Sequence, residues 1–137
     1  MSGNGGEERL AIRELVEAYN DAVMRFDGEA WAATWLDDAV WSLPGTGELS
    51  GKAKFFPLWK QMMSGFSFVG FYASAGPIVV TCESARATWW QQEVLHRKDG
   101  VKSAIHGRYE DTYAKRSGRW YFAKRVYSIL SQHEERE

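Results

Sequence analysis

The sequence predicts an α+β fold in which three helices come first and an antiparallel sheet follows. Apolar residues recur at helical spacing in the first third of the chain, β-branched and aromatic runs dominate after residue 65, and tight-turn sequences separate the last of these runs. Because βαβ crossovers are missing, this order favours an α+β fold over a parallel α/β fold. One arrangement buries most of the apolar surface: a curved sheet wrapped around the helices, which gives a cone-shaped α+β barrel with an open mouth.

The three helices are predicted from periodicity and from helix-breaking residues. Apolar residues recur every three to four positions from Glu7 to Phe26, and Asp27-Gly28 breaks this amphipathic pattern. A shorter helix is expected at Glu29 to Leu36. A third is expected to run from a Ser50 cap to about Ser64, with an irregular start because of Pro57.

The strands are predicted from β-branched and aromatic runs that end at turn sequences. A short strand at residues 39–43 is followed by a loop at 45–51, "GTGELSG". Five further strands are expected at residues 66–74, 78–82, 85–96, 101–114 and 120–131. The turn sequences "KDG" (98–100) and "RSG" (116–118) join the last three as antiparallel neighbours.

Composition indicates one globular domain. A chain of 137 residues with 45% hydrophobic content can bury a core, which we place at residues 7–131, between a disordered N-terminus (1–6) and a charged tail (132–137). A net charge of −1 gives no electrostatic footprint for nucleic acid, and no segment has the apolar length of a membrane span. With a single cysteine and no secretory signal at its start, the chain is expected to be soluble and cytoplasmic.

No metal or cofactor site is expected. His96, His106 and His133 are far apart in the sequence, which is not the spacing of a metal site. The loop at 45–51 lacks the Lys-Ser/Thr ending of a phosphate-binding loop. Any chemistry is therefore expected to be cofactor-independent.

Two long segments resemble one known family. They are Ala11 to Trp41, "AIRELVEAYNDAVMRFDGEAWAATWLDDAVW", and His106 to Arg125, "HGRYEDTYAKRSGRWYFAKR". Together they are similar to the SnoaL-like branch of the nuclear transport factor 2-like superfamily. The resemblance implies the cone-shaped fold. Its relatives include ketosteroid isomerase, scytalone dehydratase, bile acid 7α-dehydratase, hexachlorocyclohexane dehydrochlorinase, limonene epoxide hydrolase, polyketide cyclases and non-enzymatic binding domains, so the fold alone does not name an activity.

The general-base positions of these relatives carry apolar residues in this chain. In the dehydratase and dehydrochlorinase relatives, a helical Asp and a strand His form a proton-abstracting dyad, and the resemblance places them at Met24 and Phe71. The base of ketosteroid isomerase falls at Leu43. None of these side chains accepts a proton. Together with Trp41, they are expected to line an apolar pocket for a small hydrophobic ligand.

The polar residues that the resemblance assigns to the pocket are Tyr19, His106, Arg108 and Glu110. Tyr19 matches a helical hydrogen-bond donor, and the alternative is a residue that packs its ring in the core with its hydroxyl satisfied at the rim. In the strand "IHGRYEDTY", alternation puts the other three on one face, and the resemblance implies that this face points inward. Arg108 would keep the Glu110 carboxylate ionised, and His106 would move the proton. The alternative is a structural ion pair, or a cross-strand pair at a dimer face.

Two functions of different kinds follow from these residues. The first is a lyase- or isomerase-type enzyme (dehydratase, isomerase or cyclase) that transfers a proton on a small hydrophobic cyclic substrate. The second is a non-catalytic binding or accessory domain that has lost the dyad. A narrower enzyme reading is epoxide hydrolysis by a water molecule that Glu110 activates. The position of the second acid that this reaction needs falls at Val126 in the resemblance, which counts against it.

We also expect a homodimer, because adjacent Trp89 and Trp90 must point to opposite faces and the family commonly pairs through the outer face.

Overall fold

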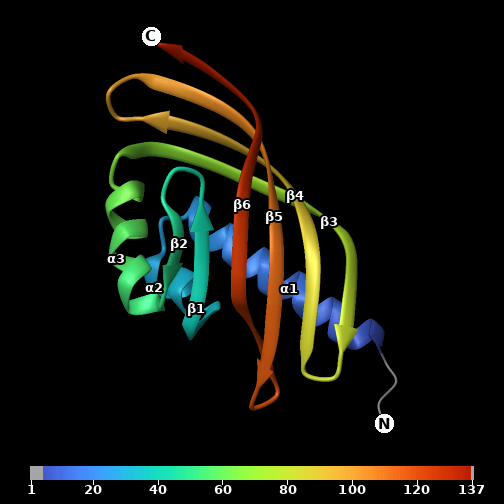
Figure 1. Ribbon diagram of the computed structural model, residues 1–137. Coiled ribbons are helices and arrows are strands. Elements are labelled where there is room, and N and C mark those ends of the chain that lie inside the picture. Colours follow the sequence, from blue (N-terminus) through green and yellow to red (C-terminus); the bar gives the residue numbers. More distant parts are fainter. Residues whose placement is uncertain (1–4, 137) are drawn as a thin grey trace.

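Three helices and six strands make up residues 5–136, the part of the chain that this computed structural model describes. In chain order they are α1 (Gly5–Met24), α2 (Gly28–Ala32), β1 (Trp35–Leu43), β2 (Gly47–Ser50), α3 (Lys52–Met63), β3 (Phe66–Thr81), β4 (Ser84–Arg97), β5 (Val101–Arg116) and β6 (Arg119–Arg136). Figure 1 shows the helices gathered against one face of a single curved sheet that does not close on itself. The predicted cone-shaped α+β fold is confirmed.

The sheet has the strand order β2-β1-β6-β5-β4-β3. Every neighbouring pair is antiparallel except β1 and β6, which run parallel and pair Trp41 with Arg125. The expectation of a wholly antiparallel sheet is therefore wrong at this junction. Hairpins from β3 to β6 fix the direction of β6, and β1 enters the sheet beside it from an earlier part of the chain.

Two helix boundaries differ from the prediction. α2 ends at Ala32, because Trp35 and Leu36 already belong to β1, and its N-terminus is capped by Asp27 Oδ1, which accepts from Ala30 N at 3.1 Å. α3 begins after Gly51, which has φ 96° and makes no side-chain cap. Ser50 is thus the end of β2 rather than a helix cap.

Several strands are longer than predicted. Residues 66–74 and 78–82 form one strand, β3, with an irregularity between Ala75 and Ile78, and part of the expected loop at 45–51 pairs with β1 as β2. The expected tail continues β6 to Arg136, because Val101–Ile105 of β5 offers it a pairing edge. Residues 5–6 belong to α1, so disorder there is also wrong. Residues 1–4 and 137 lie outside the described residues.

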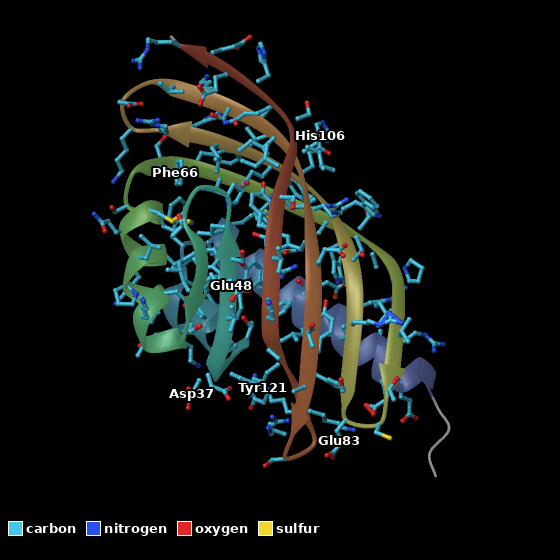
Figure 2. The ribbon with its side chains drawn as sticks, in the orientation of Figure 1. Asp37, Glu48, Phe66, Glu83, His106 and Tyr121 are labelled. Carbon is cyan, nitrogen blue, oxygen red and sulfur yellow. The ribbon has the colours of Figure 1, made fainter. Side chains whose placement is uncertain are left out.

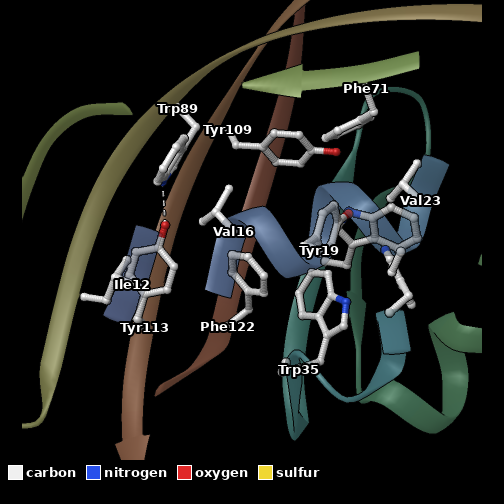
Figure 3. Packing of buried hydrophobic residues seen from close by; sticks show 14 of the residues in the cluster. Ile12, Val16, Tyr19, Val23, Trp35, Phe71, Trp89, Tyr109, Tyr113 and Phe122 are labelled. Carbon is white, nitrogen blue, oxygen red and sulfur yellow. Dashed lines mark hydrogen bonds between the residues drawn. The ribbon is translucent and has the colours of Figure 1, made fainter. Parts of the chain in front are cut away.

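The core is an aromatic cluster between the helices and the concave face of the sheet. α1 contributes a stripe at helical spacing that includes Ile12, Val16, Tyr19 and Val23 (Figure 3). Trp31 of α2 stacks on Trp59 of α3 with ring centroids 4.5 Å apart. Each buried side chain of this size stabilises the fold by on the order of 2–3 kcal/mol. No helix within residues 5–136 has the length and hydropathy needed to cross a membrane.

Candidate functional site

A cavity of about 120 Å³ lies between α1, α3 and the concave face of the sheet. Carbon atoms form most of its wall, and the side chains with an N–H, O–H or carboxyl group are six: Tyr19, Trp41, Trp59, Glu93, Tyr109 and Tyr127. The remaining lining residues are apolar: Val23, Leu43, Met62, Met63, Phe66, Val69, Phe71 and Leu95. Glu93 is the only ionisable acid or base among the lining residues that the structure describes, apart from the tyrosines.

The structure brings most of the predicted pocket residues together. Tyr19, Trp41, Leu43 and Phe71 all line the cavity, although they come from α1, β1 and β3. Met24 does not line it. The neighbouring Val23 takes that place, one turn after Tyr19 on the buried stripe of α1, while Met24 packs partly buried at the side of the core. Ligand binding by these residues stays a prediction.

The predicted orientation of β5 is wrong. The odd-numbered residues are the buried ones, including Tyr109 and Asp111, whereas His106 and Glu110 are exposed. Figure 2 shows His106 on the outer side of the sheet, away from the helices. The odd face carries the aromatic side chains, and burying them stabilises the fold more than burying three charged or polar groups would.

The three predicted catalytic residues of β5 lie on the outer face, and two of them are close to each other. Arg108 Nε lies 3.9 Å from Glu110 Oε1, and the Glu110 carboxylate accepts a hydrogen bond from Thr88 Oγ1 at 2.7 Å. This orientation agrees with the alternative of a structural pair on the outside. These side chains are not near the interior cavity.

The inner face of β5 carries a buried ionic network in their place. Asp111 accepts from Arg125 Nε at 2.7 Å and from the Tyr113 hydroxyl at 2.6 Å, and Trp89 Nε1 donates to the same hydroxyl at 2.7 Å (Figure 3). Burial raises the pKa of Asp111, while the charge and hydrogen bond of Arg125 act in the opposite direction. Because neither Asp111 nor Arg125 lines the cavity, we assign this network to the fold.

Arg125 is fully buried among aromatic rings. Its guanidinium carbon lies 3.8 Å from the ring centroid of Tyr109, 4.3 Å from that of Phe122 and 4.5 Å from that of Tyr19. These cation–π contacts offset part of the cost of burying the charge. The arrangement holds α1 against β5 and β6, and it thereby fixes the tyrosines at the wall of the cavity.

The acid–base group of the cavity is Glu93 of β4, which the sequence reasoning missed. Its Oε1 lies 3.1 Å from the Tyr127 hydroxyl, and that hydroxyl also lies 3.0 Å from Gln91 Oε1. Burial raises the pKa of Glu93, and the nearby polar groups of Gln91 and Tyr127 partly lower it. A signal for this residue existed, because Glu93 has the same strand parity as the buried Ala87 and Trp89.

Neutral hydrogen-bond donors line the same cavity as this carboxyl. Burial raises the pKa of both Tyr19 and Tyr109, so their phenols stay protonated at neutral pH. Trp41 Nε1 is buried at the cavity wall without a hydrogen-bond partner. The site therefore combines one acid–base carboxyl with donors for a ligand oxygen. Within residues 5–136, no group of three His, Cys, Asp or Glu side chains is placed to hold a metal ion.

Comparison with known proteins places the chain in one family. The sequence profile of the SnoaL-like domain matches residues 6–126. No curated protein sequence matches the chain.

Solved structures share the fold at low sequence identity. A scytalone dehydratase candidate from Novosphingobium aromaticivorans DSM 12444 superimposes with a TM-score of 0.89, at 19% identity over 97% of this chain and 91% of that one. A type 2 hexachlorocyclohexane dehydrochlorinase gives 0.85, at 20% identity over 94% and 89%. A dehydratase candidate of the nuclear transport factor 2-like family from Streptomyces avermitilis gives 0.84, at 14% identity over 93% and 99%.

Proposed function

The chain belongs to the SnoaL-like domain family, and we propose that it is a cofactor-independent enzyme of the lyase or isomerase type. It would transfer a proton on a small, hydrophobic, cyclic substrate that binds in the interior cavity. The names of the dehydratase and dehydrochlorinase structures with this fold are consistent with such chemistry.

The observation that carries the proposal is a carboxyl group held inside an apolar cavity. Glu93 is the only carboxyl at the cavity wall among the described residues, and burial raises its pKa above the usual carboxyl value, which makes its ionised form a stronger base. It replaces the Asp/His dyad whose expected positions, Met24 and Phe71, carry no proton acceptor. The proposed catalytic base thus lies on β4, whereas the dyad positions lie on α1 and β3.

The size and polarity of the cavity support a neutral ligand with a single ring. An apolar cavity of about 150 Å³ is known to hold benzene, and the cavity here is about 120 Å³. No positively charged side chain lines it among the described residues, which disfavours an anionic ligand. Tyr19, Tyr109 and Trp41 offer donors to a carbonyl or hydroxyl oxygen of the ring.

These groups support a two-step proton transfer. The Glu93 carboxylate removes a proton from a ring carbon next to a carbonyl, and the electron pair of the C–H bond moves onto the carbonyl oxygen. A phenol of the wall stabilises that oxygen by hydrogen bonding, for which Tyr19 keeps its predicted role. The carboxyl then returns the proton at another carbon, which is isomerisation, or the electron pair expels a leaving group, which is elimination.

Non-catalytic ligand binding remains the second candidate, because every family base position identified in the sequence is apolar. Binding and catalysis are separated by titrating the protein with neutral one-ring, two-ring and steroid ketones and following its tryptophan fluorescence, to which Trp41 and Trp59 at the cavity wall contribute. Conversion of each ligand that binds is then followed by proton NMR for the wild type and for Glu93→Gln.

We expect one-ring ketones to bind both proteins and only the wild type to convert them. Binding without conversion by the wild type would establish the binding function instead. Conversion at an equal rate by Glu93→Gln would remove Glu93 from the mechanism.

A further inference from the structure

Gln91 and Tyr127 meet across a strand that separates them. Gln91 belongs to β4 and Tyr127 to β6, and β5 runs between them, so their backbones are roughly 9.6 Å apart at the usual strand spacing. Their side chains nevertheless approach to 3.0 Å between the Tyr127 hydroxyl and Gln91 Oε1. Contact between side chains of alternate strands requires that the strand between them leave space.

Gly107 provides this space. It is the β5 residue paired with Gln91, and a Cβ atom built on it would lie 2.5 Å from Tyr127 Cε1 and 2.6 Å from Gln91 Oε1. Real Cβ atoms essentially never show such distances, so a side chain at this position would force the ends of Tyr127 and Gln91 to shift, whereas glycine lets them cross β5 as they are. The contact is therefore built into the inner face of the sheet, next to the cavity.

The Tyr127 hydroxyl has one proton and two acceptors. It lies 3.0 Å from Gln91 Oε1 and 3.1 Å from Glu93 Oε1, and a phenol can donate to only one of them. In the arrangement described, Gln91 Nε2 is buried without a partner. If Glu93 is protonated, it donates to Tyr127 and Tyr127 donates to Gln91 Oε1. If Glu93 is ionised, Tyr127 donates to Glu93, and Gln91 completes the chain only by turning its Nε2 toward the phenol oxygen.

We propose that Gln91 is a positioning residue for Glu93: its amide reverses when Glu93 gains or loses a proton, and through the Tyr127 hydroxyl it keeps the carboxyl hydrogen-bonded in both states. A side chain with a donor and an acceptor at the same position can serve both states, whereas an apolar or purely acceptor side chain cannot. We call the hydrogen-bond chain Gln91–Tyr127–Glu93 the relay. Its importance for turnover rests on the proposed function, whereas the relay itself can exist without that function.

The surroundings of Glu93 leave few other groups that titrate. The titratable groups at the same cavity are Tyr19 on α1, Tyr109 on β5 and Tyr127 on β6. The lining residues of β1, α3 and β3 are apolar apart from the Trp indoles. Since burial raises the pKa of each of the three tyrosines, a transition in this network below the usual range of tyrosine would belong to Glu93.

The test is an NMR titration of the intact protein without ligand. The side-chain amide signals of Gln91 are followed together with the carboxyl carbon of Glu93 from acidic to mildly alkaline pH. Gln92, the next residue on the opposite, exposed side of β4, is the matched internal control. We expect the Gln91 amide to shift with the same midpoint as the Glu93 carbon, and the Gln92 amide to ignore that midpoint.

Tyr127→Phe supplies the second arm, because it removes only the hydroxyl that joins the two residues. In this variant the Gln91 signal should lose its dependence on the Glu93 titration. A Gln91 amide that does not move with pH in the wild type overturns the proposal, as does coupling that persists in Tyr127→Phe. Coupling without turnover of any ligand would refute the proposed enzyme activity and leave the relay intact.

Discussion

Replacing Asp111 by Asn tests which face of β5 is inside. The substitution keeps the size of the side chain but removes its charge, which leaves the guanidinium of Arg125 buried without a counter-ion. The side chains of both residues are 0% exposed, so solvent cannot compensate for the loss. Glu110→Gln is the matched control, because the same chemical change is made one residue earlier on the exposed face.

The expected loss for Asp111→Asn is about 3–5 kcal/mol, which is typical when one partner of a buried ion pair is removed. For a urea dependence of about 2 kcal/mol per M, the unfolding midpoint should fall by about 2 M. Glu110→Gln should change the free energy of unfolding by less than about 0.5 kcal/mol, as an exposed substitution usually does. Replacing the pair together by Leu and Met should recover much of the stability, because a buried ion pair and an apolar pair of similar volume are often equivalent.

The assay is urea unfolding at pH 7, followed by tryptophan fluorescence and circular dichroism. If Asp111→Asn is too unstable to purify while the apolar double variant folds, the conclusion is the same. Equal shifts for the two single variants, or a larger shift for Glu110→Gln, would refute the assignment of the inner face and with it the position of the cavity.

Three further outcomes follow. Gly107→Ala should lower the free energy of unfolding by about 1–3 kcal/mol, because the added methyl group overpacks against Tyr127. The melting temperature should fall by about 4 °C for each kcal/mol lost. An unchanged melting temperature would contradict the contact of the Gln91 and Tyr127 side chains across β5. The folded-state pKa of Glu93 is raised, so its contribution to the free energy of unfolding is largest below the ordinary carboxyl pKa and is lost as pH rises through the raised value. The loss is ~1.4 kcal/mol for each pH unit between the unfolded-state and folded-state pKa. A difference in unfolding free energy between the wild type and Glu93→Gln that does not vary with pH would oppose this. We also propose that two copies pair through the outer face, where Trp90 is 50% exposed. Trp90→Glu should then halve the mass measured by sedimentation, and a monomeric wild type would exclude the dimer.

Much of the architecture could be predicted because periodicity and turn sequences report local structure directly. The amphipathic stripe of α1 and the turns between the last three strands are of this kind. Strand ends were less predictable, because they depend on partners distant in sequence. The polar residues after Gln132 join a strand only because β5 lies beside them.

The site was harder to predict because strand parity decides which side chains face the interior of a curved sheet. Alternating burial on β5 puts aromatic residues on the odd face, yet the resemblance to known enzymes favoured the even face with His106. β6 adds a register shift: Thr112 pairs with Lys124, whereas Tyr113 pairs with Phe122. This bulge places Arg125 inside as well as Phe122, three residues apart, which simple alternation forbids.

Glu93 escaped prediction for a related reason. It lies in a polar run, "QQE", that reads as a solvated strand unless Trp89 is known to point inward. Its partner Tyr127 comes from β6, and the contact depends on the glycine in the strand between them. Such pairs depend on three strands at once, so no local pattern reports them.

Deuterium exchange tests the central claim, that Glu93 moves protons inside the cavity, most directly. A one-ring ketone such as cyclohexenone is incubated in D₂O with the wild type, Glu93→Gln and Glu110→Gln, and loss of its ring C–H signals is followed by NMR. We predict that the wild type and Glu110→Gln accelerate exchange and that Glu93→Gln loses about 10²–10⁴-fold of the enhancement, as expected for removal of a general base. Equal exchange by Glu93→Gln, or loss of exchange in Glu110→Gln alone, would contradict the assignment of the catalytic base to the interior.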